Sequence, residues 1–226
     1  GDGCKYRVIA CSSESKARQV YEEYHMLDPE TYFYPAKDFL FYQADIRSKE
    51  LQESRMTVVQ AILEEKPLTV VVSFDAFMDA LPVKGAMKDR VIRIENGQTL
   101  DFDEIRKALT ENGYDREEQV DGPGQFAIRG GILDIYPLTG ELPVRIELWG
   151  DEVDSIRSFD TDSQRSVQNL DEAVIYPADE LPGRPVKRVS FLEYFPPEDT
   201  LVFLDEPARL VEKGEAVEQE FVEAQA

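Results

Sequence analysis

Apolar residues in the first third of the chain alternate between the period of a β-strand and that of an α-helix. Three short apolar runs are typical of buried strands, and the segments between them repeat their apolar residues at helical spacing. The predicted strands span residues 5–11, 31–35 and 68–73, and the predicted helices span 14–27, 48–66 and 73–81. Because strands and helices alternate, this region predicts an α/β fold with a parallel sheet that is doubly wound, or a fragment of one.

From about residue 91 the pattern changes to short strands separated by tight turns. One helix is predicted at 101–114, and its acidic first turn suits the helix dipole. Glycine and proline mark the turns between the later strands. These strands are predicted at 115–120, 126–130, 131–137, 144–150, 152–159 and 172–177. We therefore expect an antiparallel α+β module at residues 91–176.

The last part of the chain returns to α/β character, with a buried strand at 199–207 that leads into a helix from Ala208. This order predicts an α/β domain at 1–90, an inserted α+β domain at 91–176, and a second part of the first domain at 177–226. Both flanks are expected to contribute to one sheet. The helical pattern is still running at the last residue, so we expect this second part to be truncated.

The strand at 144–149 places the only tryptophan of the chain on its polar face. Strand alternation sends its apolar residues towards a core and sends Arg145, Glu147 and Trp149 the other way. By the same alternation, Arg129 lies on the polar face of the strand at 126–130. Arginine and tryptophan are enriched at protein–protein hot spots. The pattern favours equally an interaction surface and an edge aromatic packed beneath a loop, with solvated arginines beside it.

The composition is that of an ordinary globular domain, with 42% hydrophobic and 31% charged residues. No apolar run approaches the roughly 18 residues of a membrane span. Cys4 and Cys11 flank one predicted strand with their side chains on opposite faces, so we expect two reduced thiols. These features favour a cytoplasmic protein without a membrane partner.

The net charge of −21 makes direct binding to DNA or RNA unfavourable. Lysines and arginines are scattered among the carboxylates and form no basic stripe along the sequence. A protein partner is the better expectation.

The sequence also gives no sign of catalysis, a cofactor or a metal. The phosphate loop G-x-x-x-x-G-K-[ST] is absent. Gly122, Gly124 and Ala127 match the dinucleotide pattern weakly, but a strand follows them where a helix is needed. The acidic segment that begins at Asp160 has Arg165 where a calcium loop requires glycine. We expect no enzyme activity, no cofactor and no metal site.

Several segments resemble the UvrB-homology module of the bacterial transcription-repair coupling factors. They are GQFAIRGGILDIYP, PVRIELWGDEVDSIRSFD, DSQRS and IYPADE, with ADIRSKELQESRMTVVQAILEEKPLTVVVSFDAFMDALP upstream. The resemblance covers nearly the whole chain, to beyond Glu180. It implies a RecA-like α/β domain that is not a motor, interrupted by a domain that recruits UvrA for nucleotide excision repair. In the full-length family protein, an ATP-dependent DNA translocase, the C-terminal domain is expected to cover this UvrA-binding surface.

The resemblance also implies which residues bind UvrA. The first arginine of the family motif, in F-x-x-R-G, falls on Arg129, and the second, in P-x-R-[IL]-[DE], falls on Arg145. The aromatic residue four positions later falls on Trp149, where phenylalanine is more usual. The indole keeps an aromatic plane and adds an N–H donor.

The alternative is a fragment of the UvrB-type excision-repair helicase subunit, which engages DNA. That family carries a tyrosine-rich hairpin between the second strand and the long helix, and only residues 36–50 are available for it here. The coupling factors are therefore the better match. An enzyme that uses carboxylates of the inserted domain is a second alternative, for which a cleft of strongly perturbed acids would be needed.

Overall fold

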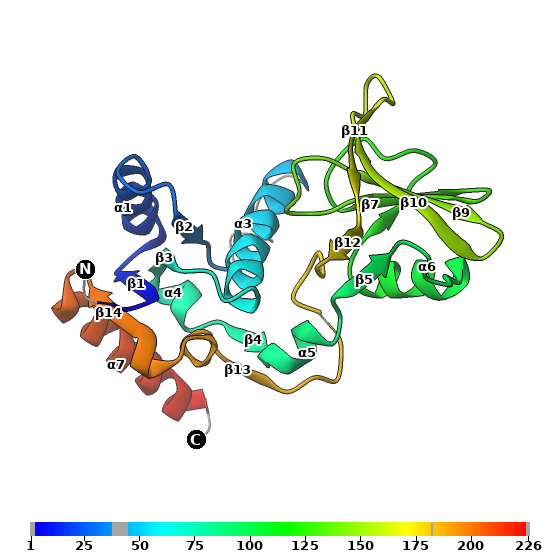
Figure 1. Ribbon diagram of the computed structural model, residues 1–226. Coiled ribbons are helices and arrows are strands. Elements are labelled where there is room, and N and C mark those ends of the chain that lie inside the picture. Colours follow the sequence, from blue (N-terminus) through cyan, green and yellow to red (C-terminus); the bar gives the residue numbers. More distant parts are fainter. Residues whose placement is uncertain (1–2, 38–44, 182, 225–226) are drawn as a thin grey trace. The chain divides into compact units, whose positions relative to one another are not determined.

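The computed structural model describes residues 3–37, 45–181 and 183–224, with side chains except at 45–48, 221 and 224 (Figure 1). The chain divides into two compact units. One, the parallel-sheet unit, comprises Gly1–Val83 and Lys187–Ala226; the other, the insertion unit, is Lys84–Val186. The domain boundaries expected from the sequence, at 91 and 176, fall inside the insertion unit.

The parallel-sheet unit is built on four strands in the order β14-β1-β3-β2 (Figure 1). They are β1 (Tyr6–Cys11), β2 (Thr31–Tyr34), β3 (Leu68–Ser73) and β14 (Thr200–Leu204). All three strand pairs are parallel, as the alternation of strands and helices predicted. Every residue of the inner strand β3 is buried, which explains its continuous apolar run. Strand β14 follows the insertion unit in sequence and pairs with β1, so both flanks contribute to one sheet.

Two of the helices in this unit begin at a serine cap. The helices are α1 (Glu14–His25), α3 (Asp45–Leu63), α4 (Phe74–Phe77) and α7 (Pro207–Ala224), with 3-10 turns η1 (Phe191–Tyr194) and η2 (Pro197–Asp199). Ser13 caps α1 by accepting a hydrogen bond from the Lys16 amide. The helix predicted at 73–81 is a single turn, because β4 (Ala80–Pro82) pairs with β13 (Arg188–Ser190). This long-range pairing overrides the local pattern.

A buried arginine ties the elements of this unit together. Arg55 on α3 is 2% exposed, and its Nη1 donates to Asp79 Oδ2 at 2.7 Å and to the carbonyl of Pro35. Its guanidinium carbon lies 4.1 Å from the centre of the Tyr34 ring. One side chain thus links α3 to the end of β2 and to the segment after α4.

The insertion unit contains a six-stranded sheet in the order β11-β10-β9-β8-β7-β6. Its strands are β6 (Asp115–Arg116), β7 (Gln125–Arg129), β8 (Ile132–Tyr136), β9 (Val144–Trp149), β10 (Glu152–Phe159) and β11 (Ser166–Leu170). All neighbours are antiparallel except the short pair β6–β7. The unit also has α5 (Lys84–Lys88), α6 (Phe102–Glu111) and a two-stranded ribbon of β5 (Ile92–Glu95) and β12 (Glu172–Ile175).

Two predictions in this unit need correction. The strand expected at 115–120 is only the two residues of β6, because the chain then turns away and buries Val120 against Ala127 and Phe159. Strand β11 was not predicted. Its residues are almost all exposed, so it has no apolar alternation to reveal it.

The described residues hold no group of three or more His, Cys, Asp or Glu side chains placed to bind a metal ion. Within the same residues, no helix combines the length and apolarity needed to cross a bilayer. Cys4 and Cys11 are both free thiols, as predicted. Burial raises the pKa of Cys11 to about 11, so this thiol is unreactive at neutral pH.

Candidate protein-interaction surface

The candidate site is the polar side of the six-stranded sheet. We define the charged face as Arg129, Asp134, Arg145, Glu147, Trp149 and Arg157. Strand register brings them to one side: Asp134 on β8 lies opposite Ala127 on β7 and Arg145 on β9, which in turn lies opposite Arg157 on β10. The alternate residues, such as Ile146 and Leu133, are fully buried on the other side. Strand alternation therefore separates an apolar side from a charged one, as the sequence predicted.

Trp149 is 83% exposed. It is the last residue of β9 and pairs with Glu152 across a tight hairpin, in which Gly150 adopts a positive φ of 68°. The hairpin carries the indole beyond the buried part of the sheet. The interpretation that Trp149 packs beneath a loop is therefore wrong. Tryptophan is highly buried on average and is enriched at protein interfaces.

Arg145 does not share this exposure. Its side chain is only 11% exposed, and its Nε and Nη2 donate to the two carboxylate oxygens of Asp134 at 2.7 and 2.8 Å. Nη2 also donates to Gln164 Oε1 at 2.7 Å, and the guanidinium carbon lies 4.2 Å from the centre of the Phe159 ring. The hydrogen bonds to Asp134 raise the pKa of Arg145.

The burial of Arg145 corrects one expectation. Strand alternation, together with the family motif, leads us to expect that Arg129, Arg145 and Trp149 form one exposed patch. The structure instead holds Arg145 beneath the 160–165 turn and against Phe159, because Gln164 closes over it. Strand alternation reports which side a residue is on and not whether a distant loop covers that side.

Asp134 is the residue of the charged face that the sequence analysis missed. Its side chain is 1% exposed, and it also accepts a hydrogen bond from Arg129 Nη2 at 2.8 Å. Arg129 itself remains 43% exposed. The available signal was a carboxylate within the apolar strand of GGILDIYP, since a buried acid normally requires a cationic partner.

Glu147 and Arg157 extend the charged face towards β10. Arg157 Nη2 donates to Glu147 Oε1 at 2.7 Å, and the Nη1 to Oε2 distance is 3.1 Å. Arg157 also lies directly opposite Arg145, an unfavourable pairing of like charges. The repulsion is reduced because each arginine forms an ion pair with its own carboxylate, Arg145 with Asp134 and Arg157 with Glu147. Arg157 lowers the pKa of Glu147 by this hydrogen bond.

A hollow of about 720 Å³ adjoins Arg129 at the other edge of the sheet. Arg116, Glu117, Glu118, Gln119 and Ile128 line it together with Arg129. The two acidic and two arginine side chains of the hollow have no net charge. A ligand there would therefore be recognised by hydrogen bonds from individual arginines and not by a positive electrostatic potential.

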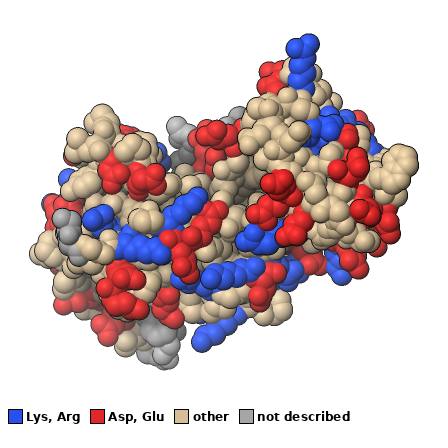
Figure 2. Space-filling view, viewed as in Figure 1, with Lys and Arg blue, Asp and Glu red and all other residues tan. Residues whose placement is uncertain are grey.

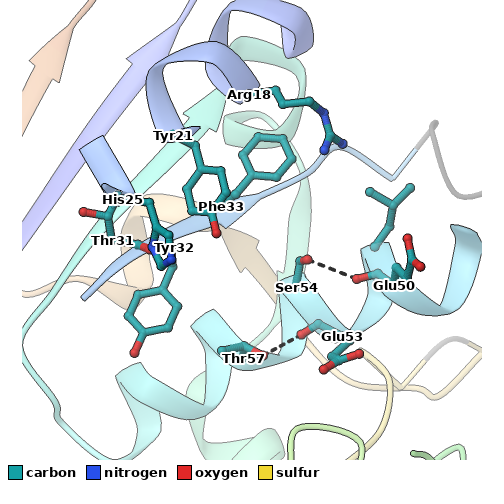
Figure 3. A pocket seen from close by; sticks show the side chains of 11 residues that line it. Arg18, Tyr21, His25, Thr31, Tyr32, Phe33, Glu50, Glu53, Ser54 and Thr57 are labelled. Atoms are coloured by element: carbon teal, nitrogen blue, oxygen red, sulfur yellow. Dashed lines mark hydrogen bonds between the residues drawn. The ribbon is translucent and has the colours of Figure 1, made fainter. Parts of the chain in front are cut away.

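The parallel-sheet unit has a pocket of about 440 Å³ between α1, β2 and α3 (Figure 3). Tyr21 and Phe33 form an aromatic wall, with ring centres 5.7 Å apart. Burial, with a smaller effect of Glu50, raises the pKa of Glu53. The hydroxyls of Ser54 and Thr57 donate to carbonyls of their own helix and are not directed at a ligand. None of the predicted site residues lines this pocket.

Surface charge shows no dominant basic region on the face drawn in Figure 2, where Lys and Arg are interspersed with Asp and Glu. The chain as a whole carries 25 basic and 46 acidic residues. The segment in which a DNA-engaging relative would carry its tyrosine-rich hairpin is 36–50, and residues 38–44 of it lie outside the described residues.

Comparison with known proteins identifies the insertion unit. The family model described as "UvrB interaction domain" matches residues 92–181. A transcription-repair-coupling factor of Bacillus subtilis (strain 168) is 39% identical over 166 residues, which are 74% of this chain and 14% of that protein. One from Staphylococcus haemolyticus is 39% identical over 146 residues, 65% of this chain and 12% of that protein. The chain thus spans about a seventh of the relatives' length. The resemblance found in the sequence is confirmed: residues 92–181 match the UvrB interaction domain, and the chain is a homologue of part of the transcription-repair-coupling factors.

Proposed function

We propose that this chain is a non-catalytic docking module that recruits UvrA to DNA damage at stalled transcription, for nucleotide excision repair. The observation that carries the proposal is the match of the UvrB interaction domain to the unit that exposes Trp149. A large exposed aromatic and a partly exposed arginine on the same side of a sheet are residue types that are enriched at protein–protein hot spots. We assign Trp149 and Arg129 as UvrA contacts, with Arg145 in the same site.

We further propose that the parallel-sheet unit is RecA-like but not a motor. The phosphate loop of nucleotide-binding proteins is absent from the sequence. The turn after β1 contains no glycine, and the helix start that follows it carries Glu14, whose buried carboxylate accepts a hydrogen bond from the Ala36 amide. A carboxylate in this position disfavours a phosphate beside it, because the two groups carry like charge. We expect neither ATP binding nor hydrolysis by this chain.

Direct DNA binding is not expected from this fragment. The net charge of −21 and the interspersed surface charges support recruitment through a protein contact. The full-length protein is proposed to be a cytoplasmic DNA translocase whose C-terminal domain covers the charged face until recruitment. Micromolar binding of duplex or single-stranded DNA in a gel shift at physiological salt would favour the UvrB-type alternative.

Isothermal titration of the chain with purified bacterial UvrA tests the proposal. We expect saturable binding to wild type and none to Arg129→Glu, because the reversed charge repels the group that arginine pairs with. Arg106→Glu on α6 makes the same charge change outside the charged face and should bind like wild type. Absence of wild-type binding would refute the docking function.

A further inference from the structure

The three-residue network of Arg129, Asp134 and Arg145 has an unequal distribution of hydrogen bonds. The buried Asp134 carboxylate accepts two from Arg145, one at each oxygen, and one from Arg129. It is the only group that links the two arginines in the described structure. A residue that holds the Asp134 side chain in place therefore also restricts the side chain of Arg129.

Arg145 is committed to its neighbours inside the unit. Its Nη2 serves both Asp134 and Gln164, its Nε serves Asp134, and its flat side lies over Phe159. Gln164 is itself tied down, because its Nε2 donates to the carbonyl of Thr161. A partner that bound the Arg145 guanidinium directly would have to displace this turn.

Arg129 has the opposite character. A guanidinium offers five N–H donors, and the described residues engage this one through a single ion pair, to Asp134. Its side chain is nearly half exposed, beside the hollow lined by Arg116 and Ile128. The remaining donors form a fork that suits a carboxylate, which can accept two parallel hydrogen bonds.

We propose that Asp134 is a positioning residue for partner binding: it holds Arg129 ready for a carboxylate of the protein partner, and Arg145 acts through Asp134 without touching the partner. This inference rests on the proposed docking function. The free energy of binding benefits because a side chain that is already ordered loses less conformational entropy when the partner arrives. Two guanidinium groups around one carboxylate also avoid the repulsion that they would otherwise exert on each other.

The test is a double-mutant cycle of UvrA affinity. Asp134→Asn keeps the side-chain shape but replaces one acceptor with an NH2 donor, so it cannot serve both arginines. We expect it to weaken binding about threefold to tenfold. In an Arg129→Gln background, Asp134→Asn should have no further effect. The matched control is Glu147→Gln, whose partner is Arg157, and its effect should be the same in both backgrounds.

A second cycle replaces Arg145 by lysine, in case Asp134→Asn does not fold. Arg145→Lys should also weaken binding in the wild-type background and have no effect on affinity when Arg129 is glutamine. A merely structural role predicts equal losses in both backgrounds. Equal losses for either variant overturn the proposal, and so does direct contact of Arg145 with the partner.

Arginine side-chain NMR on the free chain separates this proposal from the docking function. We expect the Arg145 Nε–H to exchange slowly with solvent, and the order parameter of the Arg129 Nε–H to fall in Asp134→Asn. If wild type does not bind UvrA but these signals behave as expected, the docking function fails and the positioning by Asp134 stands. An unchanged Arg129 order parameter contradicts the positioning, whatever UvrA does.

Discussion

Arg55 in the parallel-sheet unit and Arg145 in the insertion unit have nearly the same surroundings. Each donates at 2.7 Å to an aspartate, and each lies over an aromatic ring, 4.1 Å from the centre of Tyr34 and 4.2 Å from that of Phe159. They differ in what lies beyond the aspartate. Asp79, the partner of Arg55, accepts from the Lys37 amide, whereas Asp134, the partner of Arg145, reaches the half-exposed Arg129.

The difference shows that burial and pairing of an arginine do not by themselves indicate its role. The described contacts of Arg55 link three elements of the parallel-sheet unit. The Arg145 pair continues to the surface through Arg129. The second arrangement can transmit a change in a buried charge to a partner bound at the charged face, so stability and partner affinity should respond differently in the two units.

Arg55→Met should have the largest effect on stability. It leaves Asp79 and the carbonyl of Pro35 without their guanidinium donor in a buried region. We expect the free energy of unfolding of the parallel-sheet unit to fall by about 3–5 kcal/mol, measured by urea denaturation. Affinity of the still-folded protein for UvrA should be unchanged. A loss below about 1 kcal/mol would remove the structural role assigned to Arg55.

Arg145→Met should have a smaller effect on stability and, in contrast to Arg55→Met, should also weaken UvrA binding. Asp134 keeps its hydrogen bond from Arg129, so we expect a loss of about 1–3 kcal/mol in the free energy of unfolding. Arg129→Met is the matched control and should cost less, because Arg129 is more exposed and donates only once. If the two variants lost the same free energy of unfolding in urea denaturation, the claim that Arg145 makes more hydrogen bonds to Asp134 than Arg129 does would be contradicted.

Trp149→Ala should change stability by no more than about 0.5 kcal/mol, since the indole is largely exposed. Affinity for UvrA should fall by at least about 2 kcal/mol, as expected at a hot spot. Val167→Ala removes an exposed apolar side chain from β11 of the same sheet and should alter neither quantity. Calorimetric titration of the two variants distinguishes a specific contact from general surface hydrophobicity.

The smallest effect concerns the pH dependence contributed by Glu147. Arg157 lowers the pKa of Glu147 in the folded state below the unfolded value of about 4.3. The pair therefore stabilises the fold above that pH, and the contribution is lost as pH falls through the folded-state pKa. Because both side chains are partly exposed, we expect Glu147→Gln to cost about 0.5 kcal/mol at pH 7. The difference from wild type should shrink as pH falls below about 4.3 in urea denaturation, and Glu141→Gln, outside the charged face, is the matched control.

The sequence predicted those parts of the fold and the site that depend on local periodicity and motif. The parallel pairing of β1, β3 and β2 and the placement of Trp149 on the polar side of β9 follow from apolar spacing, whereas the exposure of Trp149 was left open between two interpretations. The burial of Arg145 does not, because it comes from Phe159 and Gln164, which reach it only after β10 has turned back. Asp134 was hidden in an apolar strand. Strand β4 could not be foreseen because its partner, β13, lies more than a hundred residues away.

The fluorescence of Trp149 during titration with UvrA tests the central claim most directly. As the only tryptophan, Trp149 reports on the charged face alone, provided that the UvrA fragment used contains no tryptophan. We predict red-shifted emission in the free chain and a saturable blue shift on adding the fragment. Binding that leaves the emission unchanged would show that UvrA docks elsewhere, and a free protein that already emits like a buried indole would contradict the exposed face itself.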